Sequence, residues 1–258
     1  MTSPPSLCVL SAPHLAGELL RLGRVEDPLE NEDAGEVVLS GRLAVGLISP
    51  SDASIDALLA LLRGRRSIRS FTEQPLPEGT LEKLIEAARW APSASNRHPF
   101  RFIAITERDL IDRMAVCVHE AGRKCLEGLS GEQRLAAERY AGFSTFFSGA
   151  PLVLAPFHRQ RSSFAERIGL PPERDVGALA SVSAAIMNLL LAVHVLGLGA
   201  CWMTGPLVAA DELERMLEIP KGWQLSALIP VGYPAKAAVP PARQPIERLV
   251  RRAKGKVT

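Results

Sequence analysis

One uncharged stretch constrains the fold of this 258-residue chain more than any other feature. From Val176 to Ala210 the sequence contains no Asp, Glu, Lys or Arg. A stretch of this length and polarity either spans a bilayer or lies in the centre of a folded core. Because Ser181, Asn188 and His194 interrupt it, we expect a buried helix followed by a buried strand, and no membrane span. His194 is interpreted as a core residue.

The composition excludes several classes of protein. Hydrophobic residues make up 47% of the chain, aromatic residues 5% and charged residues 22%, so the chain is too apolar to be disordered. A net charge of +2 gives no reason to expect a nucleic-acid partner or a polybasic membrane surface. The four cysteines are scattered and form no C-x-x-C motif, so we expect no disulfide framework and a reduced, cytoplasmic compartment.

Regular apolar patterns begin near Ser51. We therefore expect an N-terminal extension of unknown role over residues 1–50 and one domain over residues 51–258. Thr80 is the expected N-cap of the second helix. The patterns predict helices over 52–64, 80–92, 107–129, 131–147, 175–197, 211–217 and 246–252, and strands over 100–106, 151–157, 200–203 and 225–233. Strands separated by helices indicate an α/β or α+β sheet protein.

A basic cluster follows the first predicted helix. Residues 65–71 read RRSIRSF, with three arginines and two serines. Guanidinium and hydroxyl groups at this density suit a phosphate, which arginine binds through paired, charge-assisted hydrogen bonds. A solvated basic turn is the alternative interpretation.

Three further segments carry small or polar residues at places where the chain turns. Residues 91–100 (APSASNRHPF) connect a helix to a strand, and their small side chains allow a flat ligand to approach the backbone. Residues 197–206 (GLGACWMTGP) bring a strand close to a neighbour and then turn sharply. Arg243 follows a proline pair. Taken alone, residues 91–100 are best interpreted as an ordinary connection between a helix and a strand, and Arg243 as an exposed tail residue.

Several motifs are absent from the sequence. It contains no G-x-G-x-x-G after a strand, no G-x-x-x-x-G-K-[ST] and no G-x-S-x-G. The five histidines lack metal-ligand spacing. Cys201 has no evident general base beside it, so we expect no thiol nucleophile. We therefore predict no metal site.

Together these segments resemble the FMN-dependent nitroreductase family. The matching pieces are RRSIRSF at 65–71, APSASNRHPFRF at 91–102, GAPLVL at 149–154, GLGACWMTGP at 197–206, LIPVGYP at 228–234 and PPAR at 240–243. They occur in that family's order over residues 55–250. The resemblance implies an α+β fold of three layers, α/β/α, with a mostly antiparallel central sheet flanked by helices. It also implies an intertwined homodimer with flavin sites at the subunit interface.

The resemblance assigns roles to particular residues. Arg65, Arg66 and Ser67 match positions that hold the FMN phosphate and ribityl chain, and Arg69 matches a basic residue near the flavin pyrimidine. Pro92, Ser93, Ala94 and Asn96 match a loop that reaches the flavin of the other subunit. Met203, Thr204 and Gly205 match a strand and turn beside the flavin N5 edge, and Arg243 matches a late phosphate ligand. Pro241 and Thr204 depart from common family residues, a basic and an acidic one respectively.

The implied function is an oxidoreductase that uses NADH or NADPH and FMN. Small electrophilic acceptors, namely nitroaromatics, quinones or activated alkenes, would be reduced by a ping-pong mechanism. In such enzymes the cofactor carries the redox chemistry and the protein positions and tunes it, so we expect no catalytic side chain. Two alternatives stay open: an enzyme that acts on a flavin or F420-type precursor, and a non-catalytic flavin-binding protein.

Overall fold

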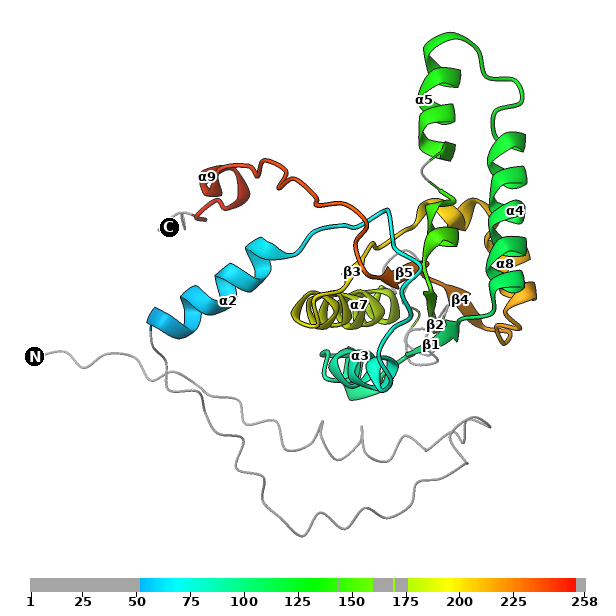
Figure 1. The fold of residues 1–258 in the computed structure, drawn as a ribbon. Helices are drawn as coiled ribbons and strands as arrows, with labels where there is room; N and C mark the ends of the chain where they lie inside the picture. The colour runs from blue at the N-terminus through cyan, green and yellow to red at the C-terminus, as the bar shows by residue number, and fades with distance from the viewer. Residues whose placement is uncertain (1–51, 143, 160–168, 170–175, 254–258) are drawn as a thin grey trace, which may run out of the picture. The chain divides into compact units, whose positions relative to one another are not determined.

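The computed structural model describes residues 52–142, 144–159, 169 and 176–253 (Figure 1). The predicted N-terminal extension, residues 1–50, lies outside the described residues, as does the predicted start of the long helix at Asp175.

A five-stranded antiparallel sheet forms the centre of the domain. The strands follow the order β1-β2-β5-β3, and β4 pairs with the far end of β2. Their bounds are Phe100–Ile105 for β1, Leu152–Arg159 for β2, Gly199–Ala200 for β3, Trp223–Leu225 for β4 and Ile229–Gly232 for β5.

Helices flank this sheet. The α-helices are α2 (Asp52–Gly64), α3 (Thr80–Arg89), α4 (Arg108–Lys124), α5 (Gly131–Gly142), α7 (Gly177–Val195), α8 (Ala210–Met216) and α9 (Ile246–Leu249). Short 3₁₀ turns are η1 (Ala94–Asn96), η2 (Phe146–Gly149) and η4 (Gly205–Ala209).

Strand β2 separates two hydrophobic cores because its side chains alternate between the faces of the sheet. Leu152 and Leu154 belong to the core that α3 and α7 cover. Val153 and Ala155 belong to the core that α4 and α8 cover. Figure 1 shows these two helix pairs on opposite sides of the strands. The α+β fold with three layers, α/β/α, and an antiparallel sheet is therefore confirmed.

Helix α7 corresponds to the uncharged stretch. It has the length and composition of a membrane span, with a mean hydropathy of 1.9, and it is the one such helix in the described part of the chain. Its buried residues, among them Val182, Ile186 and Leu189, pack in the core with α3 and the sheet. The structure thus uses α7 as a core helix, as predicted.

The predicted strand over 225–233 is wrong, because the chain forms two strands there. Leu225 pairs with Phe157 and Ile229 pairs with Leu154, which leaves one more residue on this side than on β2. An extra residue interrupts a ladder as a bulge does. Pro156 of β2 lies at the interruption, where it lacks an N–H to donate.

Other predicted boundaries change as well. Helices α3, α4 and α9 end at Arg89, Lys124 and Leu249, earlier than the predicted ends at 92, 129 and 252. The helix expected over 131–147 ends at Gly142, and η2 instead buries Phe147 fully in the second core. The strand expected over 200–203 ends at Ala200, and Met203 forms an isolated bridge. Gly79, in a left-handed conformation, precedes α3 as its N-cap, whereas the Thr80 hydroxyl donates to the Pro77 carbonyl at 2.6 Å.

Candidate functional site

The basic cluster runs as an extended segment beside β3. Ser67 forms a parallel bridge with Ala200, and the Ile68 amide donates to the Ala200 carbonyl at 2.9 Å. Ile68 is buried. Residues 65–69, which lie at the end of α2, are therefore held on the sheet and not in a solvated turn.

Gly199 permits this close approach. A Cβ atom at this position would lie 2.6–2.8 Å from three side-chain atoms of Ile68. Glycine is the residue that accepts such contact between neighbouring backbones. The sequence predicts that residues 197–206 lie close to a neighbouring segment. In the structure that neighbour is residues 65–69.

The pKa of the buried Cys201 thiol shows which side chains of residues 65–69 lie near it. Burial raises the pKa of the thiol, while Arg69, a hydrogen bond from Ser67 and Arg65 lower it. The net effect is a rise, so the thiol stays protonated and is a poor nucleophile at neutral pH. Arg65, Ser67 and Arg69 are alternate residues of an extended segment, so they share the face near Cys201.

Arg66 has a different environment. Its guanidinium donates to the carbonyl of Arg63 and, at 2.8 Å, to that of Arg65. It lines a cavity of about 280 Å³ together with Arg65, His194 and Lys236. The other lining residues are apolar or glycine, so no acidic side chain lines this cavity.

His194 is not the core residue that the sequence suggested. Its ring is half-buried and lies beside Gly64, where an added Cβ would be 2.6 Å from Nε2. This contact places the C-terminal end of α7 against the start of the basic segment.

The basic segment carries uncompensated positive charge. Among the described residues, the ion pairs join other side chains and leave Arg65, Arg66 and Arg69 unpaired. Arginines without acidic neighbours attract anions, and a phosphate is the anion that a guanidinium binds with the best geometry.

The predicted turn at 203–205 follows β3 directly. Met203 is buried and exchanges two backbone hydrogen bonds of 3.0 Å with Leu228. Thr204 is exposed and Gly205 is half-buried at the start of η4. These residues continue from Ala200 and Cys201, so the turn follows directly from the strand against which the basic segment lies.

The small-residue loop has an uncommon backbone. Ser95, Asn96 and His98 all adopt positive φ, near 50°. For residues other than glycine this conformation costs roughly 1–2 kcal/mol each, less for asparagine. Ser93 supports the loop by accepting a hydrogen bond from the His98 amide at 3.0 Å. Clusters of such residues are typical of functional sites.

This loop lies at the opposite end of α7 from the basic segment. The Ala94 amide donates to the Ser181 hydroxyl at 2.9 Å, in the first turns of α7, whereas Gly64 contacts His194 in its last turn. At 1.5 Å per residue the two contacts are about 20 Å apart along the helix. One chain therefore does not bring Pro92, Ser93, Ala94 and Asn96 to the basic segment.

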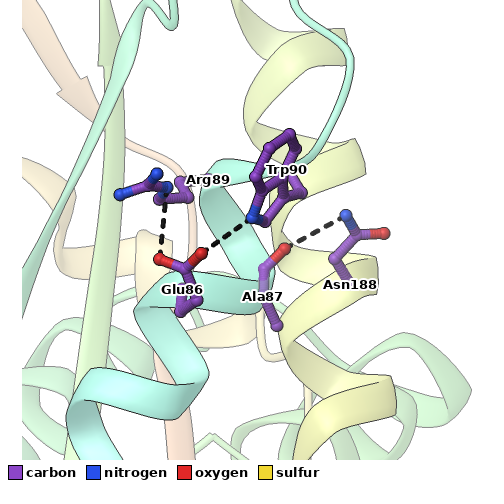
Figure 2. A network of polar contacts seen from close by, with 5 residues as sticks. All are labelled: Glu86, Ala87, Arg89, Trp90 and Asn188. Atoms are coloured by element: carbon purple, nitrogen blue, oxygen red, sulfur yellow. Dashed lines mark hydrogen bonds and ion pairs between the residues drawn. The ribbon is translucent and has the colours of Figure 1, made fainter. Parts of the chain in front are cut away.

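Helix α3 leads into this loop and is tied to α7 (Figure 2). Asn188 of α7 donates to the Ala87 carbonyl at 3.2 Å. Trp90, 72% exposed, donates from its indole to Glu86 at 2.8 Å, and Arg89 pairs with the same carboxylate at 3.2 Å. Sequence reasoning missed Trp90 and treated Asn188 only as a polar interruption.

Arg243 is exposed in an irregular segment, and no contact of its guanidinium is recorded within the described part of the chain. Residues that precede Arg243 do approach the basic segment. The Ala235 amide donates to the Ser70 carbonyl at 2.9 Å, and Ala238 lines the cavity beside Arg65 and Arg66. The structure thus brings this segment near Arg65 and Arg66 but does not place Arg243 against them.

Comparison with known proteins gives consistent results. The model of the Nitroreductase family matches residues 62–233. An NADH dehydrogenase of Thermus thermophilus is 30% identical over 204 residues, which cover 76% of this chain and 95% of that protein. The crystal structure of a BluB-like flavoprotein from Clostridium difficile 630 is 28% identical, with a TM-score of 0.66, over 76% of this chain and 99% of that chain. Oxidized iodotyrosine deiodinase, whose structure contains FMN and 3-iodo-L-tyrosine, shares the fold at 24% identity, with a TM-score of 0.62 over 76% of this chain and 99% of that chain.

Proposed function

The chain belongs to the nitroreductase family, and from this we propose that it is an FMN-dependent oxidoreductase that oxidises NADH or NADPH. Its acceptors are small electrophiles, namely nitroaromatics, quinones or activated alkenes. Reductant and acceptor use the same site in turn, in a ping-pong mechanism. Members of the family are generally oxidoreductases. The acceptor class and the nicotinamide reductant are our proposal.

The observation that carries this proposal is the basic face beside β3, whose arginines form no ion pair with any residue that the structure describes. Arg65, Ser67 and Arg69 share one side of an extended segment that Ile68 and Gly199 hold against the sheet. Two guanidinium groups and a hydroxyl suit a phosphate and a polyol. The neighbouring turn at Thr204 and Gly205 offers small side chains to a flat ring. The donor set therefore fits FMN.

The residues have separate tasks in this proposal. Arg65 and Ser67 bind the phosphate and ribityl chain, with Arg66 and Arg243 adding positive charge. Arg69 places a cation near the pyrimidine edge, where it stabilises negative charge in the reduced state. Met203, Thr204 and Gly205 line the edge at which the substrates bind. FMN, when bound, supplies hydride transfer, so no side chain is needed as acid or base.

We infer that the functional unit is a homodimer. Only eight of the nineteen residues of α7 are buried in one copy, although the helix is almost wholly apolar. The basic segment and the loop at Pro92, Ser93, Ala94 and Asn96 lie at opposite ends of that helix. A second copy that supplies this loop completes the site and covers the exposed part of α7.

The near-neutral charge and scattered cysteines support a cytoplasmic enzyme with small-molecule substrates and no nucleic-acid or membrane partner. We also propose that residues 1–50 are an extension outside the catalytic domain, which begins near Ser51.

The visible absorption spectrum of the purified protein tests this function. We expect the two absorption bands of an oxidised flavin, bleached by NADH or NADPH without oxygen and restored by a nitroaromatic or quinone. A colourless protein that does not bind added FMN would contradict the proposal. A flavin band that neither nucleotide bleaches would favour a non-catalytic flavin-binding protein.

A second candidate is an enzyme that acts on a flavin or F420-type precursor, and the shared fold of a BluB-like flavoprotein is consistent with it. Two measurements separate the candidates. A nitroreductase oxidises NAD(P)H in proportion to acceptor and retains its flavin through many turnovers. An enzyme that consumes a flavin loses the absorption bands in air after reduction.

A further inference from the structure

We propose that Ser181 is a positioning residue that holds the Ser93–His98 loop in its binding conformation. The inference rests on the proposed function, in which this loop reaches the flavin of a second copy. Ser181 touches neither the basic segment nor the turn at Gly205 in the described structure, so it acts through the loop.

The hydrogen bonds of Ser181 differ from those of its neighbour Ser183. Both hydroxyls donate to the carbonyl four residues earlier on α7, Ser181 to Gly177 at 2.6 Å and Ser183 to Leu179 at 2.7 Å. Only Ser181 also accepts a hydrogen bond from the loop, from the Ala94 amide at 2.9 Å. It is 3% exposed, so water cannot readily replace this acceptor.

The loop requires such an external support. Three of its residues, Ser95, Asn96 and His98, adopt left-handed backbone conformations that are unfavourable for side chains other than glycine. The bond from the His98 amide to Ser93 lies within the loop and does not attach it to the domain. The Ala94–Ser181 bond attaches the first half of the loop to α7.

The other contacts around the loop differ in kind from the hydrogen bond to Ser181. Gly177 allows the loop to approach α7, because a Cβ there would lie 3.1 Å from that of Ala94. The end of α3, from which the loop begins, is attached to α7 by the Asn188 amide, which donates to the Ala87 carbonyl (Figure 2). The far end of the loop is attached to β2, where the Arg159 amide donates to the Pro99 carbonyl at 3.2 Å. Within the first half of the loop, the Ser181 hydroxyl is the side-chain group of α7 that accepts a hydrogen bond from the loop backbone.

A loop held in this way binds without first being ordered. When only a fraction of molecules has the competent conformation, the apparent dissociation constant rises in inverse proportion to that fraction. Loss of the Ser181 hydroxyl should lower that fraction in both copies of a dimer. Affinity for FMN should fall, while the basic segment and its charges stay unchanged.

Hydrogen exchange of the flavin-free protein tests the positioning directly. In Ser181→Ala we expect amides of residues 93–98 to exchange about tenfold faster, the loss expected when a buried amide loses its acceptor. Amides of the last turns of α7 should exchange at the wild-type rate. Ser183→Ala is the matched control, since it removes the same bond within the helix and should leave the loop unchanged.

FMN titration then measures the consequence. Ser181→Ala should raise the FMN dissociation constant about tenfold, whereas Ser183→Ala should leave it unchanged. If Ser181→Ala does not fold, Ser181→Cys keeps a side chain of similar shape with a weak acceptor and should show the same effects at smaller size.

The outcomes separate this inference from the proposed function. Unchanged loop exchange in the Ser181 variants, or an equal change in Ser183→Ala, overturns the role of Ser181. Faster loop exchange with unchanged FMN affinity also overturns it, because the loop would then be irrelevant to binding. Wild-type protein that binds no FMN refutes the proposed function, while the exchange data still report whether Ser181 holds the loop.

Discussion

Replacement of Gly199 by alanine should separate the basic segment from β3. The new Cβ would lie 2.6 Å from Cγ1, 2.7 Å from Cβ and 2.8 Å from Cγ2 of Ile68. A rotation of the Ile68 side chain could move the two γ-carbons away. It cannot move Cβ, so the two backbones must move apart.

The structure gives a magnitude for this change. Overpacking of a core costs typically 1–3 kcal/mol. The hydrogen bond of 2.9 Å from the Ile68 amide to the Ala200 carbonyl is weakened as well, and its loss costs about 0.5–1.5 kcal/mol. The free energy of unfolding should fall by about 2–4 kcal/mol, which lowers the melting temperature of a domain of this size by about 4–16 °C. Since Arg65, Ser67 and Arg69 move with the segment, FMN affinity should fall too.

Urea unfolding and FMN titration of Gly199→Ala measure both effects. Gly149→Ala is the control, because Gly149 is exposed, has no positive φ and an added Cβ meets nothing within 4 Å. The double variant Ile68→Ala/Gly199→Ala should remain less stable than Ile68→Ala, because the contact with Cβ persists. A double variant as stable as Ile68→Ala, or a Gly199→Ala protein that matches the wild type, would refute the reasoning.

Three further predictions concern the phosphate contact, the N-terminal extension and pH. Arg65→Ala should weaken FMN binding by roughly 1.5–3 kcal/mol, the value of a hydrogen bond to a charged group, and an unchanged dissociation constant would exclude Arg65 as a ligand. A chain that begins at Ser51 should bind FMN and turn over as the full chain does, and lost activity on truncation would give residues 1–50 a catalytic role. Burial lowers the pKa of His158 below its ordinary value of 6.5, so the unfolded chain binds a proton at higher pH than the folded one, and stability falls as the pH drops through 6.5. His158→Asn should flatten the dependence of the unfolding free energy on pH between 5 and 8, and an unchanged slope would show that another group causes it.

The sequence predicted most elements because their patterns are local. Helices α2, α3 and α7 follow apolar residues at helical spacing, and β1 and β2 follow short β-rich runs between turn signals. The break between β4 and β5 was not predictable, because it depends on the register against β2 and on Pro156 within that strand. Register between strands distant in sequence is not encoded in either strand alone.

The candidate site, like the fold, was predictable where its features are local in sequence and not where they depend on contacts between distant residues. The sequence identified residues 65–69 as basic, but did not separate Arg65, which lies near Cys201, from Arg66, whose guanidinium donates to the carbonyls of Arg63 and Arg65, because these contacts depend on the path of the backbone after α2. It identified the small residues at 92–96, but not Ser181, whose contact with the loop joins residues distant in sequence. Polar residues within an apolar helix are the available signal for such contacts, and both Ser181 and Asn188 carry it.

The exposed apolar surface connects the fold to the proposed site. Ile55, Leu58 and Leu62 are 48%, 46% and 39% exposed and lie on one face of α2. Covering the exposed part of such a side chain contributes about 1 kcal/mol. A second copy that covers this surface and α7 would bring its own loop at 92–96 to the turn at Gly205. Association and flavin binding then stabilise each other, since a ligand held by two copies binds the dimer in preference to the separated chains. A homodimer would therefore account both for the exposed apolar side chains of α2 and α7 and for the division of the site between the ends of α7.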